Sequence, residues 1–469
     1  MNAGSVRTYD LIVMGAGSGN MLPGGDLAHL TTAIIEPDRF GGTCLNRGCI
    51  PSKMLVVAAD AALAVEEAAR LGVHATLDRV DWPGIRDRVF GRIDPLHANA
   101  VDYRRASGID VFLESARFLA PRLLQVGAEQ LTADRIVVAV GSRPYVPPIP
   151  GLDTIDYQTS DTIMRIDAIP ASLLVIGGGY IAAELGHVFG AFGSEVTIVQ
   201  RGPRLLMMED EQLSDRYTEL ASARHRVLLD SEVVAVERRG TGAVVTIERP
   251  GGREVLEVEM VLVAAGRVPN TDLIDAPAGG LELDDHGHLV VDDAYRASVA
   301  GVWAFGDAAN HYQLKHMANA EMRLVRHNLV HGHSPQLLSG RPVPHAVFAH
   351  PQIASVGLTE QEAVRRGVPH AVAVQPYSNA AYGWALEDTT SFVKVLMDPK
   401  ERTLLGAHII GPQAATLLQP LVQAMLLGQT ADQLARDVIY LHPGLAEVVE
   451  QALLKLIETA PASGSAESP

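Results

Sequence analysis

Two cysteines, Cys44 and Cys49, are the only cysteines in the 469-residue chain, and they stand five positions apart. A single disulfide would be a poor structural staple for a chain of this length, so the pair is better suited to redox chemistry. The spacing alone leaves a second interpretation open, in which both are buried thiols that never meet. Residues five apart on a regular α-helix have Cα atoms about 8.7 Å apart, more than the roughly 7 Å that a disulfide spans. A bond between them therefore requires a distorted turn, which Gly48 and Pro51 permit.

Glycine-rich loops follow two of the predicted strands. The apolar run Tyr9–Met14 leads into Gly15–Asn20, and the run 173–176 leads into Gly177–Ala182. A strand, a glycine-rich turn and a helix start form the dinucleotide-binding arrangement, because glycines let the backbone approach a pyrophosphate at the helix N-terminus. Glu36 ends the next strand and is expected to accept hydrogen bonds from a ribose; a plain strand-end carboxylate is the alternative. Two such units predict two dinucleotide sites with electron transfer between them.

Composition narrows the class of protein. The chain is 47% apolar, which fits about three packed domains at this length. A net charge of −17, without a visible Lys/Arg-rich patch, argues against a nucleic-acid or anionic-membrane partner. The first nine residues lack the apolar core of a signal peptide, and no segment reaches about 18 consecutive apolar residues. We therefore expect a soluble, cytoplasmic protein.

Segments rich in proline and glycine mark the expected domain boundaries. The run Gly141–Gly151 contains four prolines, so it is predicted to be neither helix nor central strand and to separate the two glycine-rich units. The strand-like run 260–263 is also followed by a glycine and a proline, Gly266 and Pro269, which end the second glycine-rich unit. The expected division is 1–150 and 271–341 for one dinucleotide-binding domain, 151–270 for the other, 342–459 for a C-terminal domain and 460–469 for a disordered tail.

The segment Gly41–Lys53 around the cysteines, GGTCLNRGCIPSK, resembles the flavoprotein disulfide reductases, which include glutathione reductase and dihydrolipoamide dehydrogenase. Further motifs of this family follow in the same order: Gly177–Glu184, Gly266–Asn270, Trp303–Asp307 and His442–Glu447. The resemblance extends from about Tyr9 to Glu450. It implies an α/β fold with two Rossmann-like domains, the first for FAD and the second for NAD(P)H, and a C-terminal α+β dimerisation domain.

The resemblance also implies a route for electrons. Hydride from the nicotinamide would reach the Cys44–Cys49 disulfide through FAD, leaving Cys49 as a thiolate beside the flavin and Cys44 to attack the substrate disulfide. Lys53, with Glu184 as its ion-pair partner, would place a cation near the flavin. A solvated surface lysine is the alternative for Lys53.

The late His-Pro motif implies an acid–base group. His442, oriented by Glu447, resembles the family's histidine that protonates the leaving thiolate, and an ordinary histidine is the alternative because the chain has 17. The family is homodimeric, and His442 and Glu447 are expected to serve the cysteines of the opposite subunit. The apolar helix candidates 417–427 and 448–454 are expected to form this two-fold surface rather than to pack only within their own domain.

The expected cofactor contacts follow from the same motifs. For FAD they are Gly15, Gly17, Ser18, Gly19, Asn20, Glu36, Gly42, Thr43, Gly141, Gly306 and Asp307, with a turn-forming role as the alternative for the aspartate. For the nicotinamide coenzyme they are Gly177, Gly179, Tyr180, Ile181, Arg201, Arg204 and Gly266. Gln200 stands near the position of the ribose-binding acid of NAD enzymes, and the two nearby arginines suit a 2′-phosphate, so NADPH is expected over NADH. His345 and His350 lack partners at ligand spacing, so no metal site is expected.

Within the family, the segments Gly17–Asn20, Leu314–Asn319 and Ala381–Asp388 resemble mycothione reductases. They imply mycothione as the substrate, with glutathione disulfide or lipoamide as alternatives. A flavin-binding redox sensor without turnover is the alternative from another class. The intact set of two cysteines, His442 and Glu447 argues against it, because a sensor does not need an acid for a leaving thiolate.

Two departures from the family pattern carry structural expectations. Asn20 replaces the third glycine of the first loop, and Pro23 with Gly24 and Gly25 falls where a helix would continue. A shortened or kinked first helix is predicted, with a weaker dipole toward the FAD pyrophosphate. Arg47 occupies a position that is often aliphatic in the family, and the sequence offers no role for it.

Overall fold

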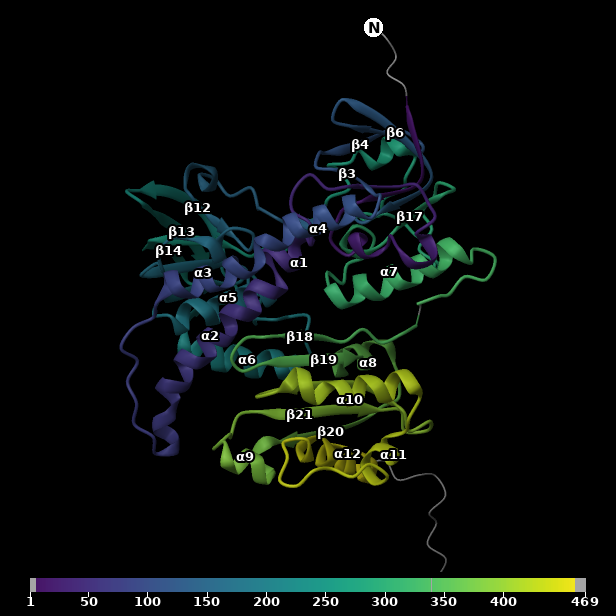
Figure 1. Ribbon diagram of the computed structural model, residues 1–469. Coiled ribbons are helices and arrows are strands. Elements are labelled where there is room, and N and C mark those ends of the chain that lie inside the picture. Colours follow the sequence, from purple (N-terminus) through teal and green to yellow (C-terminus); the bar gives the residue numbers. More distant parts are fainter. Residues whose placement is uncertain (1–5, 339, 460–469) are drawn as a thin grey trace, which may run out of the picture.

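The computed structural model describes residues 6–338 and 340–459, so the expected tail at 460–469 lies outside the described residues. Helices and strands gather in a region at the top of Figure 1, a second at the left and a third at the bottom. The first two regions are each built around parallel strands, and the third around an antiparallel sheet. The expected α/β fold class, with two Rossmann-like units and a C-terminal α+β unit, is confirmed.

The first sheet carries the first glycine-rich loop. Its parallel strands lie in the order β3-β2-β1-β6, β17 continues beside the end of β6, and the antiparallel β5 and β4 extend from its start. The strands are β1 (Arg7–Met14), β2 (Thr32–Ile35), β3 (Asp110–Phe112), β4 (Ala116–Ala120), β5 (Leu123–Val126), β6 (Glu129–Val138) and β17 (Val302–Ala304). Helix α7 (Lys315–Val330) packs on one face, and a segment with the short 3-10 helix η6 (Ala276–Gly279) packs on the other. Because both faces are covered, the buried residues of β1 and β2 are apolar except for Thr32.

The second sheet carries the second glycine-rich loop. All its strands are parallel, in the order β11-β10-β9-β15-β8. They are β8 (Gln158–Thr159), β9 (Ser172–Ile176), β10 (Glu195–Val199), β11 (Arg226–Leu228) and β15 (Met260–Val263). Helices α5 (Tyr180–Ala191) and α6 (Glu211–Arg224) cover one face. The other face packs against an antiparallel sheet of β12 (Glu232–Arg239), β13 (Gly242–Arg249) and β14 (Gly252–Val258), with η4 (Leu152–Thr154) beside it.

The proline-rich linker forms a short strand outside both parallel sheets. Strand β7 (Ser142–Pro144) pairs antiparallel with β16 (Arg267–Pro269), so the two connections between the parallel sheets run side by side. The prediction that this segment is neither helix nor central strand is therefore confirmed. After β16 the chain returns to the first sheet, which combines strands from residues 7–138 with β17.

The third region is the C-terminal sheet, in the order β18-β19-β22-β21-β20. Its strands are β18 (His345–Val347), β19 (Ile353–Gly357), β20 (Ala371–Pro376), β21 (Phe392–Met397) and β22 (Leu404–Ile410). Around it lie α8 (Glu360–Arg366), η8 (Tyr377–Asn379), α9 (Ala381–Ala385), α10 (Ala414–Leu427), α11 (Ala431–Arg436) and α12 (Glu447–Thr459). One face packs on α10, α11 and α12, and side chains of the other join the apolar core that contains α5.

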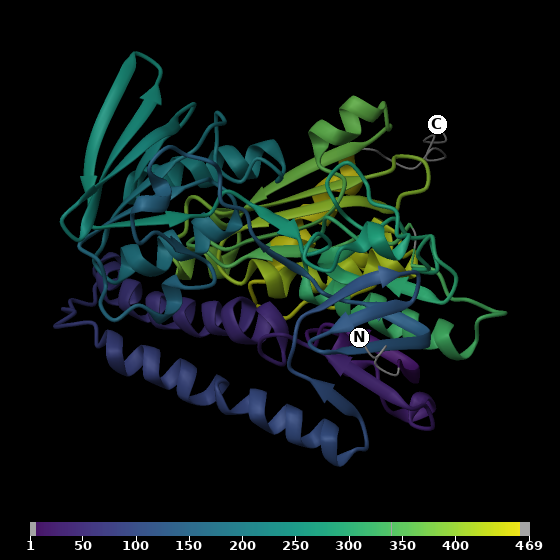
Figure 2. The ribbon, with the colours of Figure 1, turned by 90° about the horizontal axis from the view of Figure 1, so that it is seen from above.

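Helices from the first part of the chain lie along the molecule, at the lower edge of Figure 2. They are α1 (Gly42–Arg47), α2 (Cys49–Glu67), η3 (Ala68–Leu71), α3 (Trp82–Ile93) and α4 (Pro95–Ala106). The stretch Gly42–Leu71 is long and apolar enough to cross a membrane by length and composition alone. Its residues Leu55, Val56 and Ala59 are buried in the apolar core shared with α3 and α5, and 33% of its most apolar 18-residue window is buried.

The first glycine-rich loop does not lead into an α-helix. The chain forms the 3-10 helices η1 (Gly19–Met21) and η2 (Gly25–Leu27) instead. The expectation of a shortened or kinked helix therefore understated the change. Pro23 has no backbone N–H to donate, and Gly24 adopts a φ of 113°, which is not helical. These two residues prevent a regular α-helix from forming after the loop.

The apolar C-terminal helices bury most of their side chains within their own domain, so their expected part in a two-fold surface stays a prediction. Leu417, Leu421 and Val422 of α10 are buried, and so are Val448 and Leu453 of α12, because these side chains cover the C-terminal sheet of their own chain. Exposed apolar side chains remain at the end of α10, where Leu426 is 48% exposed and Leu427 67%, and Ile439 (94%), Leu441 (81%) and Trp384 (65%) are exposed as well. The end of α10, the connection between α11 and α12, and α9 therefore all carry uncovered apolar side chains.

A buried ion pair joins the second region to the third. Lys394 Nζ of β21 lies 2.7 Å from Asp210 Oδ1, at the start of α6, and 2.6 Å from Glu360 Oε2. The side chains of Lys394 and Asp210 are almost fully buried. Burial alone would raise the pKa of Asp210, but the Lys394 hydrogen bond and the Glu360 backbone amide hold it below its ordinary value. The charge of Asp210 is therefore part of the folded state at neutral pH.

We expect Lys394→Met to destabilise the fold by about 3 kcal/mol, because it leaves a buried carboxylate without its cation. The urea midpoint of unfolding, followed by far-UV circular dichroism, measures the loss. Lys400→Met is the control, since that lysine is 87% exposed and its loss should change little. Recovery of most of the stability in Lys394→Met with Asp210→Leu would show that the unpaired charge causes the loss. An unchanged midpoint in the single variant would contradict the argument.

Candidate active site

A cleft of about 2070 Å³ opens between the first sheet, the second sheet and the C-terminal sheet. It exceeds the roughly 300–1,000 Å³ of a site for one small ligand. Most of the predicted site residues line it: Gly15, Gly17, Ser18, Glu36, Gly42, Thr43, Cys44, Cys49, Lys53, Gly141, Gly179, Tyr180, Ile181, Glu184, Gly306 and Asp307. Gly19, Asn20, Gly177, Gly266, Arg201, Arg204, His442 and Glu447 lie outside its lining in the described part of the chain.

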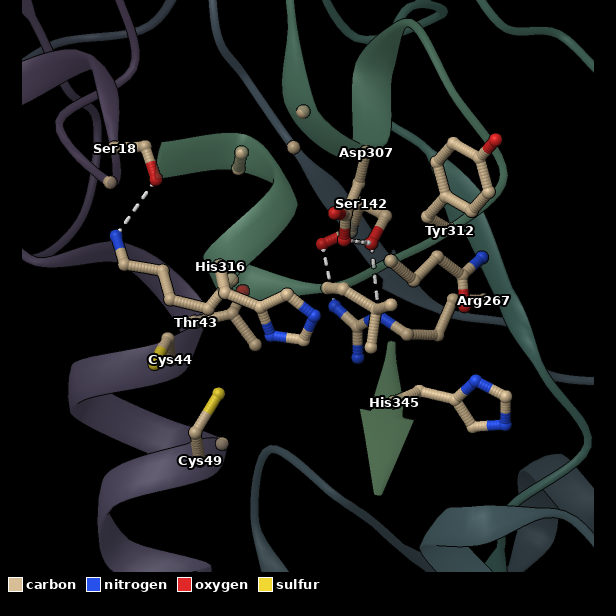
Figure 3. Close-up of a pocket in the computed structure, with 18 of the residues that line it drawn as sticks. Ser18, Thr43, Cys44, Cys49, Ser142, Arg267, Asp307, Tyr312, His316 and His345 are labelled. Atoms are coloured by element: carbon tan, nitrogen blue, oxygen red, sulfur yellow. Dashed lines mark hydrogen bonds between the residues drawn. The ribbon is translucent and has the colours of Figure 1, made fainter. Parts of the chain in front are cut away.

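A break between two helices brings the cysteines together. Helix α1 ends at Arg47, Gly48 takes φ −140° and ψ −122°, and α2 begins at Cys49. A Cβ at Gly48 would lie 3.0 Å from Thr43 O, so the break has little room for a side chain. The two thiols lie within hydrogen-bond reach of each other and face the cleft (Figure 3). The predicted distorted turn is confirmed, and the alternative of two thiols that never meet is excluded.

The pKa values of the two thiols are shifted in opposite directions. The hydrogen bond from Cys49 lowers the pKa of Cys44, burial opposes this, and the charge of Lys315 adds to the lowering. The same thiol–thiol contact, together with burial, raises the pKa of Cys49. The pair titrates as a unit, and its first thiolate forms at lower pH than an isolated cysteine would allow. An adjacent thiol and thiolate are the reduced form of a pair that can exchange with an external disulfide.

The two glycine-rich loops have the same close packing. A Cβ on Gly15 would lie 2.3 Å from Ala139 O, and a Cβ on Gly177 would lie 2.3 Å from Ala264 O. Both glycines have φ above 100°, which side chains rarely adopt. Each loop therefore runs against the end of the neighbouring strand, at the carboxyl edge of its parallel sheet. This is the edge where dinucleotides bind in such folds.

A polar network connects the linker strands to the 3-10 helix η7 (Gly306–Ala308). The Ser142 hydroxyl donates to Asp307 Oδ2 at 2.6 Å and accepts from Arg267 Nε at 2.9 Å, as Figure 3 shows. Arg267 also donates to Ser142 O at 2.8 Å. The network fixes the Asp307 carboxylate in the cleft. Ser142 and Arg267 were not predicted as site residues, although Arg267 stands in a motif used for the resemblance and Ser142 in the proline-rich linker.

Lys53 and Glu184 lie near each other without a direct ion pair. Lys53 Nζ lies over the ring of Phe348, and Glu184 Oε1 accepts a hydrogen bond from Phe348 N at 2.9 Å. Their charges interact, but no bridge within 4.0 Å joins them among the described residues. Burial lowers the pKa of Lys53 to about 8 and raises that of Glu184. The expected ion pair is thus replaced by two charges separated by Phe348.

Three residues about which the sequence was uncertain have defined places. Glu36 Oε2 accepts from Ala16 N at 2.8 Å, which ties it to the first loop, and burial raises its pKa. The side chain of Asn20 accepts from Arg104 Nε at 2.8 Å, outside the cleft. Arg47 pairs with Asp38 and lies 3.6 Å from Asp161 Oδ2. It therefore links the end of α1 to the segments that follow β2 and β8.

The two arginines expected to meet a 2′-phosphate differ in their surroundings. Arg204 pairs with Glu211 and lies 3.0 Å from Asp215 Oδ1, so acids already balance its charge. Arg201 is 77% exposed and lies 4.0 Å from Glu232. Gln200, at the end of β10, contacts Met207 Sδ at 3.4 Å. Arg201 is therefore the better placed of the two for an added anion.

His442 and Glu447 form a pair on the outside of their own chain. His442 Nδ1 lies 2.7 Å from Glu447 Oε1, and the histidine side chain is 74% exposed. Neither lines the cleft that holds the cysteines. The carboxylate fixes the imidazole orientation and leaves Nε2 directed away from it. Leu441, next to His442 in the sequence, is 81% exposed, and Ile439 is 94% exposed. The oriented histidine therefore lies beside exposed apolar side chains.

Comparison with known proteins defines the class. Residues 9–322 match the model of the pyridine nucleotide-disulphide oxidoreductases, and residues 343–453 match the dimerisation domain of the same family. The chain belongs to the pyridine nucleotide-disulphide oxidoreductase family. It is an FAD- and NADPH-dependent disulfide oxidoreductase, and its C-terminal domain supports a homodimer.

Particular relatives refine this picture. The chain is 45% identical to the mycothione reductase of Mycobacterium tuberculosis, over 96% of this chain and 100% of the relative. It is 34% identical to a dihydrolipoyl dehydrogenase of Haloferax volcanii, over 96% of this chain and 97% of the relative. Among solved structures, the HOCl-induced flavoprotein disulfide reductase RclA from Escherichia coli superposes with a TM-score of 0.84 at 26% identity. That match covers 95% of this chain and 99% of RclA.

The residues of the cleft fit FAD. The cradle at Gly15 and Gly17 lets backbone approach a phosphate group, and Gly17 packs so closely on Gly42 that a Cβ on Gly42 would lie 2.8 Å from Gly17 Cα. Asp307 and Glu36 present carboxylates at two further points of the same cleft, where hydroxyl groups can donate to them.

We expect Cys44→Ser and Cys49→Ser to separate the roles of the two sulfurs. Cys44→Ser should keep a long-wavelength charge-transfer absorbance while disulfide turnover falls to background, because the assignment places Cys49 beside the flavin and the substitution removes the Cys44 contact that raises the pKa of Cys49. Cys49→Ser should lose the absorbance on two-electron reduction. Visible spectra of the purified yellow protein, recorded during anaerobic titration, measure both. An intact band in Cys49→Ser would contradict the assignment.

Proposed function

We propose that this protein is an NADPH-dependent mycothione reductase, which reduces mycothiol disulfide to two mycothiols. The full-length identity of 45% to mycothione reductase is the observation that carries the substrate. The thiol pair in a cleft with two glycine-rich loops supports the reaction type. We also propose the division into 1–150 with 271–341, 151–270 and 342–459, which follows the sheets, and a cytoplasmic location.

The residues of the cleft suit the first half of the reaction. FAD would be held by the loop at Gly15 and Gly17 with the carboxylates of Glu36 and Asp307, and it would supply the transfer of two electrons from NADPH to the Cys44–Cys49 disulfide. Gly48 keeps the sulfurs close enough to open and close that bond without moving either helix. Lys53 is a cation near the start of the same helix; burial lowers its pKa, and the charges of Glu184 and Asp60 oppose that lowering. Tyr180 and Ile181, at the start of α5, line the side of the cleft that belongs to the second glycine-rich loop.

The second half needs an acid that the chain does not place in its own cleft. Cys44 attacks one sulfur of the substrate, one thiol leaves as a thiolate, and Cys49 then displaces the second thiol as the disulfide re-forms. His442, oriented by Glu447, protonates the leaving thiolate. Its exposed position outside the cleft supports action on the cysteines of a second subunit.

The substrate is tested by NADPH oxidation with mycothione, glutathione disulfide and lipoamide in parallel. We expect kcat/KM for mycothione to exceed that for the other two by about tenfold or more, since binding groups matched to one substrate are left unpaired with another. Better turnover of glutathione disulfide than of mycothione would reject the proposed substrate and leave the enzyme class intact.

The coenzyme is tested by steady-state rates with NADPH and NADH. We expect Arg201→Ala to lower kcat/KM for NADPH by about tenfold, because a charge-assisted contact to the 2′-phosphate is lost. The value for NADH should stay the same. Arg239→Ala, at an arginine that is 66% exposed in the same region, is the control. Equal efficiency with both coenzymes, unchanged in Arg201→Ala, would refute the preference.

The shared site is tested with mixed dimers. Cys44→Ser and His442→Ala subunits are each expected to be inactive, and exchange between them should restore about a quarter of wild-type activity, because half of the dimers then carry one intact site. Subunit exchange is confirmed with differently tagged chains. Confirmed exchange without recovery would show that His442 acts within its own subunit or not at all.

A further inference from the structure

The first glycine-rich loop lacks the positive end of an α-helix. In the second unit, α5 begins at Tyr180, directly after the loop, and extends over 12 residues. Such a helix places about half a unit of positive charge at its N-terminus. The first loop is followed by η1 and η2, which have 3 residues each and supply no comparable dipole. A phosphate group at this loop therefore needs positive charge from another element.

Two of the nearby cations hold the loop in shape. Arg104 of α4 donates to Asn20 Oδ1 at 2.8 Å and to Pro23 O at 3.3 Å. Arg326 of α7 donates to Gly24 O at 2.7 Å. Both guanidinium groups satisfy oxygens on the side of the loop that follows the glycines. They replace the hydrogen bonds that a regular helix would have made within itself.

Lys315 is the cation on the cleft side. Its Nζ donates to Ser18 Oγ at 2.8 Å, and the Ser18 hydroxyl in turn donates to Asn319 Oδ1 at 3.0 Å. Ser18 is 8% exposed and belongs to the glycine-rich loop itself. Lys315 and Asn319 stand one helical turn apart on α7 and both line the cleft. The contact therefore fixes an ammonium group against the loop that faces the dinucleotide.

The position of this lysine is unfavourable without an anion. Lys315 is the first residue of α7, where the helix dipole repels a positive charge, and α7 has no acidic residue in its first turn. No carboxylate lies within 4.0 Å of its Nζ in residues 6–338 and 340–459. An ammonium group has three donors, and Ser18 takes one of them. A half-buried cation at such a place indicates an anionic ligand.

We propose that Lys315 binds the pyrophosphate of FAD at the first glycine-rich loop, in place of the missing helix N-terminus, with Ser18 and Asn319 fixing its ammonium group. The proposal rests on the FAD dependence of the family and does not depend on which disulfide is reduced. The charge of Lys315 also reaches Cys44, whose pKa it helps to lower, so the lysine lies between the loop and the redox pair. A charge-assisted contact to phosphate oxygens is among the stronger hydrogen bonds in proteins.

Release of FAD from the holoenzyme tests this role. Holoenzyme is diluted to a series of concentrations, and free FAD is measured by the recovery of its fluorescence. We expect Lys315→Met to raise the FAD dissociation constant by about ten- to a hundredfold. Lys315→Arg should keep most of the affinity because it keeps the charge. Lys400→Met removes a lysine that is 87% exposed and should leave the dissociation constant unchanged.

Further measurements separate charge from packing and from action on the flavin ring. The gap between wild type and Lys315→Met should narrow as NaCl rises, because salt screens a charge contact. Ser18→Ala keeps the lysine and loosens its anchor, so a smaller loss is expected. Unchanged affinity in Lys315→Met would overturn the proposal, and so would an equal loss in Lys315→Met and Lys315→Arg with a normal urea midpoint. A shifted flavin midpoint potential with unchanged FAD affinity would assign the charge to the ring and overturn it too.

Discussion

The approach of the two thiols depends on one irregular residue, Gly48. A continuous helix from Gly42 to Glu67 would hold Cys44 and Cys49 too far apart for a bond, and the break at Gly48 interrupts that helix between the two cysteines. The rest of the structure keeps this break in place. Helix α2 packs in the core with α3 and α5, and Arg47 at the end of α1 is paired with acids from two different segments. Packing therefore holds the helix that carries Cys49, and the contacts of Arg47 hold the helix that carries Cys44.

The cleft is nearly balanced in charge although the chain is acidic, because eight lysines and arginines and seven aspartates and glutamates line it. The net charge is −17, yet Lys53, Lys315 and Arg267 all face the space beside the cysteines. Two dinucleotides bring several phosphate charges into this space, and these cations lower the cost of that charge. The buried acids Glu36 and Glu184 accept backbone hydrogen bonds, which offset part of the cost of their burial. The cleft is therefore less negative than the molecule as a whole.

The two halves of the proposed site lie on different surfaces of one chain. The cysteines face the cleft, whereas His442 and Glu447 lie near the exposed side chains of Ile439 and Leu441. A two-fold contact brings each surface to its counterpart on the second chain, which creates equivalent sites from one interface. The Lys394–Asp210 pair joins the C-terminal sheet to the second region of the same chain. It therefore helps to fix where His442 and Glu447 lie relative to the cleft of their own subunit.

Sequence alone determined the parts that depend on local pattern: the glycine-rich loops after β1 and β9, the distorted turn between the cysteines, and the linker at β7. These follow from residue type and spacing, since only certain residues fit a positive φ or a close backbone approach. The tertiary structure decided which charges meet. Lys53 and Glu184 are separated by Phe348, and Arg204 is balanced by two acids. Lys315 reaches Ser18 from nearly three hundred residues away, as its hydrogen bond shows. The tertiary structure also decided that the apolar faces of α10 and α12 are covered within the chain. Hydrophobic periodicity predicts which face of a helix is buried, but it does not predict which element covers that face.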